Sequence, residues 1–539
     1  MVKAFLVPAI CALVFLSCAK KQDPKLVLVI VVDQMREDFF QKFGHTFGKN
    51  GINRLLKNGI RFRNHLIPYI NTETGAGHAV LLSGLLPKTS GIVSNKWYEP
   101  GTEHSISCIQ GIARDSVFYA GGRKQSSPRL FRGHMIGDFL KEKNPEAKVF
   151  SVAVKDRSAI LLGGKKADAA YWPDKDYRMV SSAYYLPGLP EWVNTWNRAN
   201  AVDRRYKRVW RPFRDTALYR KAEMPADNPW VAGRAWSGPF PHTISHSLFG
   251  ESVFQMERML SFVKELILQE DVGGDHHPDI LAWSISIPDY TGHRYGMESR
   301  ELMDVYARVD SLIENLLDYV DRKAGKGQYS VFLTSDHGIR KTVELAVSKG
   351  NPEALRIDKS AITRAFIDSL RKEYAITRDK AVNADFRLVR IRSNSVYFNR
   401  ELADSLGLPF QDIKARCQAY LKGVPGIRKV FDINSLEGGD LFLKAARNNF
   451  FPGRMGELLI DLDPDANFKV SLGMHGYFGT DCQHIPLIAV IPGRVQGVVE
   501  RYTSIADLAP SIARMLGVPV TDRMDGSVLE ELFEPQNIQ

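Results

Sequence analysis

Continuous apolar runs that end at a polar residue recur along this chain, and they restrict its fold more than any other feature of the sequence. Such β-branched runs are typical of the central strands of a parallel sheet, where both faces are buried. Residues 25–32 (KLVLVIVV) are followed directly by Asp33. The same arrangement recurs at residues 148–154 before Lys155, at residues 279–287 before Asp289 and at residues 329–333 before Asp336.

Helical patterns lie between these runs, at residues 36–57, 251–268 and 301–320, and residues 486–491 form another apolar run. Strands that alternate with helices predict an α/β fold with a mostly parallel central sheet flanked by helices. Ligands of such sheets bind at the carboxyl ends of the strands. We therefore expect the polar residues that follow the predicted strands to lie close together, namely Asp33, Lys155, Asp289 and Asp336.

A chain of 539 residues is long enough for two to four domains or for one large core with insertions. We predict a catalytic core in two parts, residues 25–344 and 451–539. Residues 165–250 are rich in Trp, Tyr, Pro and Arg and form either a cap-like insertion over the site or a packing layer. Residues 345–450 are predicted to be a small α+β subdomain, with strands at 386–391, 395–398 and 427–431 and a helix at 411–421.

The amino terminus has the pattern of an export signal. A basic start and an apolar run to Leu16 predict a signal peptide over residues 1–17, too short to span a bilayer as a mature helix. Cys18 is then the predicted lipidated residue, and residues 18–24 form a tether. The alternative is simple cleavage near Ala19. The expected location is the periplasm or, for a lipoprotein, the outer membrane or cell surface.

The net charge of +11 suits an anionic partner, but the Lys and Arg residues are spread along the chain. Nucleic-acid binding is therefore not predicted, and small phosphorylated molecules are the expected ligands. The remaining cysteines, Cys108, Cys417 and Cys482, have no zinc-finger spacing and are expected to be buried thiols.

Acids and imidazoles cluster near the predicted strand ends. Asp289 and His293 are four residues apart, Asp336 and His337 are adjacent, and His475 and His484 come late in the chain. Mixed Asp and His ligands without Cys favour a catalytic zinc site, although manganese uses similar ligands.

Residues 71–78 (NTETGAGH) place Thr74 before small residues and an apolar run, which predicts a loop that enters a helix. Thr74 is expected at or near the N-cap, beside free backbone N–H groups. Two interpretations remain open at this point, a simple capping residue and a nucleophile. We interpret His78 as structural.

Together these segments resemble the alkaline phosphatase superfamily, and most of all the monomeric PafA-type bacterial enzymes with a Thr nucleophile. The resemblance covers almost the whole chain after residue 32. It depends on the motifs VVDQMR at 31–36, TETGAGHA at 72–79, GIVSNKWY at 91–98, VKDR at 154–157, PDYTGH at 288–293, TSDHG at 334–338, MHGY at 474–477 and the segment 504–517 before Asp525 and Gly526.

The resemblance implies a centre with two zinc ions and a covalent phospho-threonine. One zinc would be held by Asp289, His293 and His475, although His484 is close in sequence to His475. The other would be held by Asp33, Asp336, His337 and the Thr74 oxygen. Phosphoryl oxygens would accept hydrogen bonds from Asn95, Lys155 and Arg157.

The predicted function is that of a monomeric phosphate monoester hydrolase, an alkaline phosphatase that acts on small molecules. Lys155 and Arg157 favour the extra charge of a monoester, unless they only pair with nearby carboxylates. The alternatives are a phosphodiesterase or nucleotide pyrophosphatase with the same site, and a surface lipoprotein that binds phosphorylated ligands without turnover.

Overall fold

The computed structural model describes residues 24–102, 104–231, 238–374, 388–494 and 496–534. The predicted signal peptide, Cys18 and nearly all of the predicted tether lie outside these residues. Within the described residues, no helix combines the length and the apolar character that crossing a membrane requires. Cys108, Cys417 and Cys482 are free and buried, as predicted.

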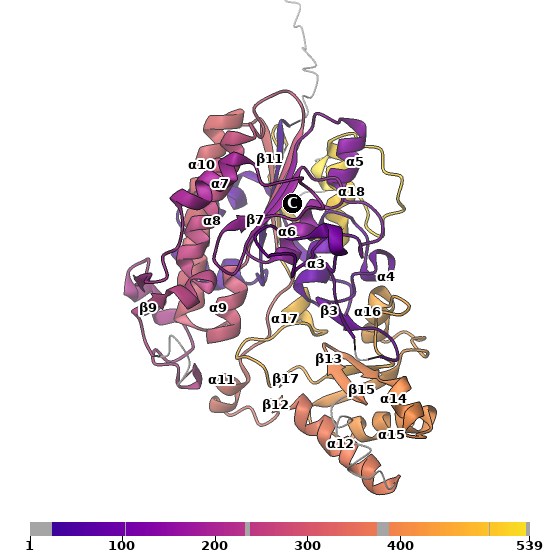
Figure 1. Cartoon of the computed structure of the whole chain (residues 1–539). Coiled ribbons are helices and arrows are strands. Elements are labelled where there is room, and N and C mark those ends of the chain that lie inside the picture. The colour runs from indigo at the N-terminus through magenta and orange to yellow at the C-terminus, as the bar shows by residue number, and fades with distance from the viewer. Residues whose placement is uncertain (1–23, 103, 232–237, 375–387, 495, 535–539) are drawn as a thin grey trace, which may run out of the picture.

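A nine-stranded sheet forms the centre of the molecule and confirms the predicted α/β class (Figure 1). β1 lies in its middle, parallel to β10 and β11, and every residue of β1 is buried. β18 is antiparallel to both of its neighbours, β11 and β2. In spatial order the strands are β19 (Gly497–Ser504), β2 (Ile60–Leu66), β18 (Leu487–Val490), β11 (Tyr329–Thr334), β1 (Leu26–Val32), β10 (Asp279–Ile285), β5 (Val149–Ala153), β6 (Ala169–Pro173) and β7 (Met179–Val180).

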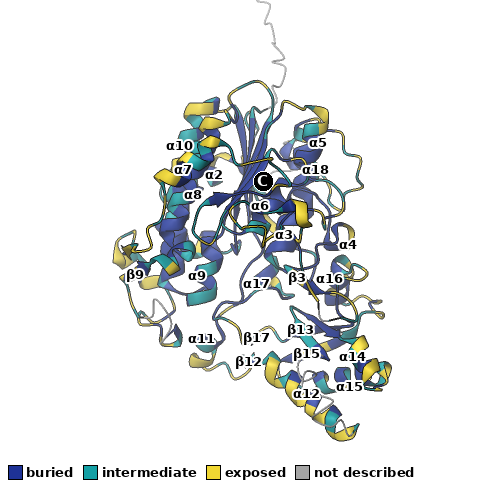
Figure 2. Ribbon diagram, in the orientation of Figure 1, coloured by how far each residue is buried: buried dark blue, intermediate teal, exposed yellow. Residues whose placement is uncertain are grey.

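Helices cover both faces of this sheet, because alternate residues of its central strands point to opposite sides. Val27, Val29 and Val31 pack on one face with α3 (Thr74–Leu81), α5 (Ile136–Lys143), α6 (Asp156–Gly163) and α18 (Leu508–Met515). Leu26, Leu28 and Ile30 pack on the other with α1 (Phe39–Phe43), α2 (Ile52–Asn58), α8 (Val253–Gln269) and α10 (Arg300–Val320). Figure 2 shows these strands buried between helices that expose only their outer sides.

The helical pattern predicted over residues 36–57 is confirmed in part, because it is divided among separate helices. The segment forms α1, a 3-10 turn (Gly44–Thr46) and α2. Asp310 of α10 explains the break, because its carboxylate accepts hydrogen bonds from the backbone N–H groups of Gly48 and Ile52, at 2.6 and 2.8 Å. Those donors fix a turn that a straight helix could not make.

Residues 165–250 begin with β6 and β7, which belong to the central sheet. The rest forms α7 (Glu191–Ala199) and a hairpin of β8 (Lys207–Trp210) and β9 (His242–Ser245). This part packs on α8 and α10. Trp210 Nε1, for example, donates a hydrogen bond of 2.7 Å to Asp304 of α10. Such contacts belong to a packing layer, and a cap over the site remains a prediction.

A second, four-stranded antiparallel sheet has its own core. Its order is β13 (Val389–Arg392), β14 (Ser395–Phe398), β16 (Leu458–Leu462) and β15 (Ile427–Asp432), and it packs with α12 (Lys359–Glu373) and α15 (Phe410–Lys422). β16 comes after residue 450, so this sheet extends past the predicted boundary. Figure 1 shows this unit beyond the carboxyl ends of the central strands, on the side of α3.

Candidate active site

The polar residues that follow the central strands meet at one point. Asp33 follows β1, Lys155 precedes α6 after β5, and Asp289 lies in the first turn of α9 (Ile287–Tyr295) after β10. Lys155 Nζ lies 2.6 Å from a carboxylate oxygen of Asp33 and 2.6 Å from one of Asp289. The expected convergence is confirmed for these three residues, since they come from three neighbouring strands of the sheet.

Two groups of acids and imidazoles flank this lysine. The inner group is Asp33, Asp336 and His337, all fully buried, and its ligand atoms lie within 4.8 Å of one another. The outer group is Asp289, His293 and His475. His293 Nε2 lies 3.2 Å from Asp289 Oδ1 and 3.1 Å from His475 Nε2. His337 also lies within 4.8 Å of Asp289 and His475, so its ring adjoins both groups.

Thr74 lies against His337 of the inner group and against Lys155. It is the first residue of α3 and is fully buried, and its Oγ1 lies 3.3 Å from Lys155 Nζ and 3.5 Å from His337 Nε2. Glu73 occupies the N-cap position instead, with an extended backbone. The simple capping interpretation of Thr74 is therefore wrong. The hydroxyl faces the acids and imidazoles, at the positive end of a helix.

The structure places His475 and His484 apart. His475 joins the outer group, and its Nδ1 contacts the carbonyl oxygen of Thr72 at 2.9 Å, which leaves Nε2 directed at Asp289. His484 contacts the Arg63 carbonyl at 2.6 Å, away from both groups. His78 is held by the Thr74 carbonyl and by Ser284, each at 2.8 Å, in agreement with a structural role.

Asn95 and Arg157 line one cavity of about 490 Å³. The side-chain oxygen of Asn95 accepts a hydrogen bond of 2.7 Å from the backbone N–H of Gly75, so its amide nitrogen is left to donate elsewhere. Arg157 Nε is buried without a hydrogen-bond partner among the described residues. Lys155 thus pairs with carboxylates, as one alternative expected, whereas no described carboxylate pairs with Arg157.

Gln34 is a part of the site that sequence reasoning missed. Its backbone N–H donates to Asp336 Oδ1 at 3.2 Å and its side-chain Nε2 donates to Asp289 Oδ1 at 2.7 Å. These two bonds require the left-handed backbone that Gln34 adopts, with φ of 71°. A non-glycine residue rarely adopts this conformation unless the surroundings enforce it. Its place directly after Asp33 was the only available signal.

The electrostatics of the site call for added positive charge. Burial and the neighbouring Asp336 carboxylate hold the pKa of Asp33 well above its ordinary value, although Lys155 opposes them. Burial lowers the pKa of His337 to about 3, so this ring is neutral and can offer a lone pair. Asp33 Oδ1 and Asp336 Oδ2 are buried and face imidazole nitrogens, with His337 Nε2 at 3.5 and 3.4 Å and His78 Nδ1 at 3.2 Å from Asp336 Oδ2. Buried carboxylate oxygens beside imidazole nitrogens fit divalent cations.

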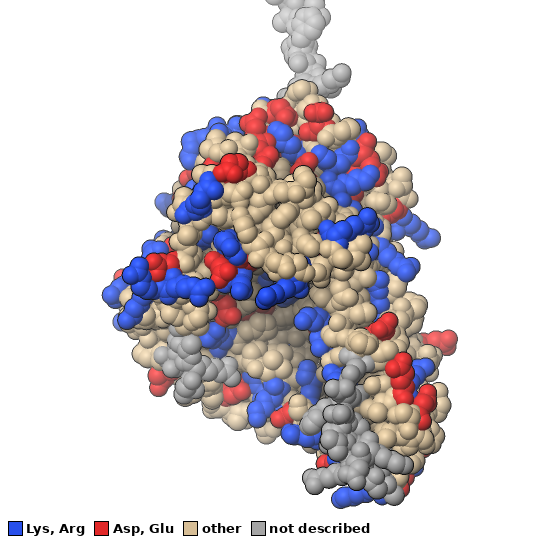
Figure 3. Space-filling view, in the orientation of Figure 1, with Lys and Arg blue, Asp and Glu red and all other residues tan. Residues whose placement is uncertain are grey.

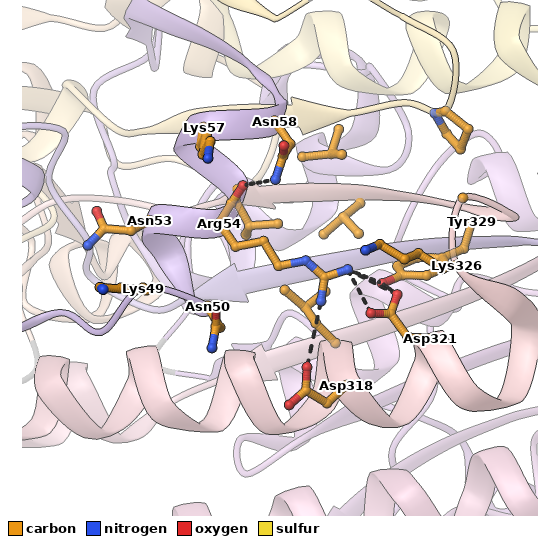
Figure 4. Close-up of a pocket in the computed structure, with 16 residues that line it drawn as sticks. Lys49, Asn50, Asn53, Arg54, Lys57, Asn58, Asp318, Asp321, Lys326 and Tyr329 are labelled. Atoms are coloured by element: carbon orange, nitrogen blue, oxygen red, sulfur yellow. Dashed lines mark hydrogen bonds and ion pairs between the residues drawn. The ribbon is translucent and has the colours of Figure 1, made fainter.

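The most voluminous of the described cavities, about 870 Å³, lies elsewhere (Figure 4). It is at the opposite edge of the sheet, where β11 begins. Arg54 crosses it and forms an ion pair of 2.9 Å with Asp321. Neither acid–imidazole group reaches this cavity. Its size therefore does not identify the functional site, and the strand ends do.

A model of the type I phosphodiesterase / nucleotide pyrophosphatase family matches residues 27–477, which include every residue of both groups. The chain belongs to this family. Three relatives of similar length match it over nearly their whole chains. They are a calcium-transporting ATPase of Myroides odoratus (30% identity, 99% of this chain and 99% of that protein), alkaline phosphatase PhoV of Synechococcus elongatus (29%, 95% and 93%) and alkaline phosphatase PafA of Elizabethkingia meningoseptica (27%, 95% and 94%).

The fold of this family member is that of PafA. The crystal structure of wild-type PafA superimposes with a TM-score of 0.85 at 24% identity, over 95% of this chain and 99% of that chain. The resemblance to the alkaline phosphatase superfamily, and to PafA within it, is thereby confirmed.

Proposed function

We propose that this protein is an alkaline phosphatase that hydrolyses small phosphate monoesters through a phospho-threonine at Thr74. One observation carries the proposal. A buried hydroxyl with no capping role lies 3.5 Å from His337 and 3.3 Å from the ammonium of Lys155, which itself contacts one carboxylate of each acid–imidazole group. The names of the relatives PhoV and PafA support the same activity.

The two groups are the proposed places for two zinc ions. Asp33, Asp336 and His337, with the Thr74 oxygen, would hold one ion, and Asp289, His293 and His475 would hold the other. Such cations supply positive charge that stabilises the attacking and leaving oxygens of an in-line displacement. The Asp and His donors suit zinc, and the absence of Cys from both groups suits a catalytic site.

The residues of the chain account for the remaining requirements. Thr74 Oγ1 attacks phosphorus while the bond from phosphorus to the leaving oxygen breaks. Lys155 holds positive charge beside this hydroxyl, and Asn95 and Arg157 donate to the oxygens of the phosphoryl group. Water then cleaves the phospho-threonine, which releases phosphate and restores the hydroxyl.

The cations around the site support a monoester substrate. Figure 3 shows a hollow between the part of the molecule built on the central sheet and the unit that contains the second, four-stranded sheet. Lys and Arg side chains lie along its rim. A monoester dianion carries one more charged oxygen than a diester, and a guanidinium can bind such oxygens through two parallel hydrogen bonds. Arg157 Nε is buried without a hydrogen-bond partner among the described residues, so it is available for this contact.

Diester hydrolysis is the second candidate, because the family model that matches the chain is named for phosphodiesterases. Turnover of 4-nitrophenyl phosphate and of bis(4-nitrophenyl) phosphate, measured with zinc content on the same protein, separates the candidates. We expect two zinc ions per chain and a much higher kcat/KM for the monoester. A preference for the diester would overturn the proposal in favour of the second candidate, and no turnover of either would leave a binding protein.

Export to the periplasm and lipidation at Cys18 are further parts of the proposal, supported by the apolar run and the Cys that follows it. Mass spectrometry of the protein from its native membrane fraction would test them. A diacylated residue 18 at the amino terminus is the expected result, and an unprocessed Met1 would contradict it.

A further inference from the structure

Glu73, which neither the sequence motifs nor the proposed reaction accounts for, lies at the junction of three parts of the molecule. It precedes Thr74 in the chain, it faces the loop that carries Asn95, and it faces the turn between β13 and β14 in the second sheet. Its side chain is half-buried and forms no ion pair with any described Lys or Arg. A carboxylate of this kind must be satisfied by hydrogen bonds from neutral donors.

Three such hydrogen bonds are present. One carboxylate oxygen, Oε2, accepts from the backbone N–H of Asn95 and from the hydroxyl of Ser94, each at 2.8 Å. The other, Oε1, accepts from the hydroxyl of Ser393. Bonds to an ionised acceptor are the stronger kind, and two of these three fix the loop that carries Asn95.

The orientation of Asn95 follows from these bonds. Glu73 holds its backbone, and the N–H of Gly75 donates to its side-chain oxygen at 2.7 Å. The backbone and the side chain of Asn95 are therefore each fixed by a residue that adjoins Thr74 in the chain, Glu73 and Gly75. With the amide oxygen engaged by Gly75, the nitrogen is the side-chain group left to donate to a ligand, and Asn95 lines the same cavity as Arg157.

The second sheet takes part through a strained residue. Ser393, in the turn between β13 and β14, has φ of 49°, a left-handed conformation that is uncommon for serine. Its hydroxyl reaches Glu73, and next to it Asn394 donates to the carbonyl of Gly476 at 2.9 Å, beside the outer-group ligand His475. Strain of this kind persists where the surroundings enforce it.

We propose that Glu73 is a positioning residue for the proposed phosphatase reaction, which orients the Asn95 amide toward the phosphoryl group and links the site to Ser393 of the second sheet. The inference rests on the proposed function. It adds a role for the α+β unit, which acts on the reaction through one hydroxyl and one carboxylate, without a residue that touches the substrate.

A double-mutant cycle of Glu73→Ala and Asn95→Ala, read as kcat/KM for 4-nitrophenyl phosphate, tests this inference. Asn95→Ala alone should cost about 100-fold, the usual effect of losing one donor to a developing charge. Glu73→Ala alone should cost at least about tenfold. If Glu73 acts through Asn95, adding it to Asn95→Ala should cost less than about threefold more. If the loss of kcat/KM in the double variant equals the product of the losses in the two single variants, the inference is overturned.

Conservative and matched variants separate positioning from folding. Glu73→Gln keeps an oxygen acceptor toward Asn95 and should recover kcat/KM to within about fivefold of wild type. Ser393→Ala should lower kcat/KM by about threefold in the wild-type background and should not lower it further in the Asn95→Ala variant. Glu298 is a matched control, because it is a buried carboxylate that accepts from the Thr342 hydroxyl and N–H at 2.7 and 3.3 Å. Glu298→Ala should lower the melting temperature and leave kcat/KM unchanged.

The outcomes also distinguish the two proposals. Absence of turnover by the wild-type protein contradicts the proposed function itself. Wild-type turnover with a Glu73→Gln variant as impaired as Glu73→Ala, at equal zinc content and melting temperature, contradicts only the role of Glu73 as an acceptor.

Discussion

The inner and outer groups of the site hold their ligand atoms in different ways. The inner group comes from the ends of the central strands, and its three side chains are fully buried. Backbone N–H groups and Ser335 surround it. The outer group comes from α9 and from the loop that carries His475, and the His293 side chain is 29% exposed. Its rings are oriented by the carbonyls of Gly473 and Thr72, at 2.7 and 2.9 Å.

This difference indicates a division of labour. The inner group has two carboxylates for one imidazole and is fully buried, so a cation there would be held tightly and would stabilise the Thr74 oxygen. The outer group has one carboxylate for two imidazoles and a partly exposed His293, so a cation there would exchange more easily and would be open to the leaving group and to water.

The largest expected effect comes from Thr74, beside His337 and Lys155. Thr74→Ala should lower kcat/KM for 4-nitrophenyl phosphate by at least about a thousandfold, because the nucleophile is lost. Zinc content and melting temperature should stay near those of the wild type. Thr74→Ser keeps a hydroxyl and serves as the control. Activity near the wild-type level in the alanine variant would show that neither group serves this hydroxyl.

Arg157 belongs to neither group. Its removal therefore tests recognition of the charge of the phosphoryl group separately from the role of the proposed metal ions. Arg157→Ala should lower monoester kcat/KM by about 100-fold and diester kcat/KM by less than about fivefold, since only the monoester has the additional charged oxygen. Lys124, which pairs with Asp156 at 2.6 Å in the same cavity, provides a matched control in Lys124→Ala. Equal losses for the two substrates would assign Arg157 to general binding.

Removal of metal compares the two groups directly. Titration of the zinc-loaded protein with a chelator should release two ions in two phases, the outer ion first. His293→Asn should weaken the affinity for the ion released first by at least about tenfold. It should leave the affinity for the second ion unchanged, because the contacts of His293 are with the outer group. Release of both ions in a single phase, or an effect of His293→Asn on the tightly held ion, would refute the division.

The smallest expected effect is on stability, and it distinguishes the two groups by pH. In the metal-free protein, burial lowers the pKa of His337 from its ordinary 6.5 to about 3. The unfolded chain therefore binds a proton below pH 6.5 that the folded chain binds only near pH 3. The free energy of unfolding should therefore decrease as the pH is lowered from 6.5 to 3, by up to about 1.4 kcal/mol per pH unit.

His293 shows the opposite shift. The Asp289 carboxylate raises its pKa although burial opposes this, so its contribution is present below pH 6.5 and is lost as the pH rises through the raised value. In urea titrations, His337→Asn should flatten the slope between pH 6.5 and 3, whereas His293→Asn should leave that slope unchanged. The reverse result would exchange the roles of the two rings.

The sequence was sufficient for the fold class and for the residues at strand ends, because both depend on local patterns. A buried parallel strand has a distinct composition, and the first polar residue after it lies at the ligand-binding edge. Lys155, Asp33 and Asp289 illustrate this.

What the sequence could not give depends on contacts between distant segments. The break in residues 36–57 needs Asp310, more than 250 residues away. The choice between His475 and His484 depends on which loop reaches Asp289, since both histidines precede β18. Gln34 and Glu73 act through hydrogen bonds whose partners come from other strands and from the second sheet.

The central claim is that an enzyme hydroxyl, and not water, first receives the phosphoryl group. The stereochemistry at phosphorus tests it most directly, by transfer of an isotopically chiral phosphoryl group from an aryl phosphate to an added alcohol. Two in-line displacements, through Thr74, predict retention of configuration. Inversion would show a single direct displacement and would contradict the account.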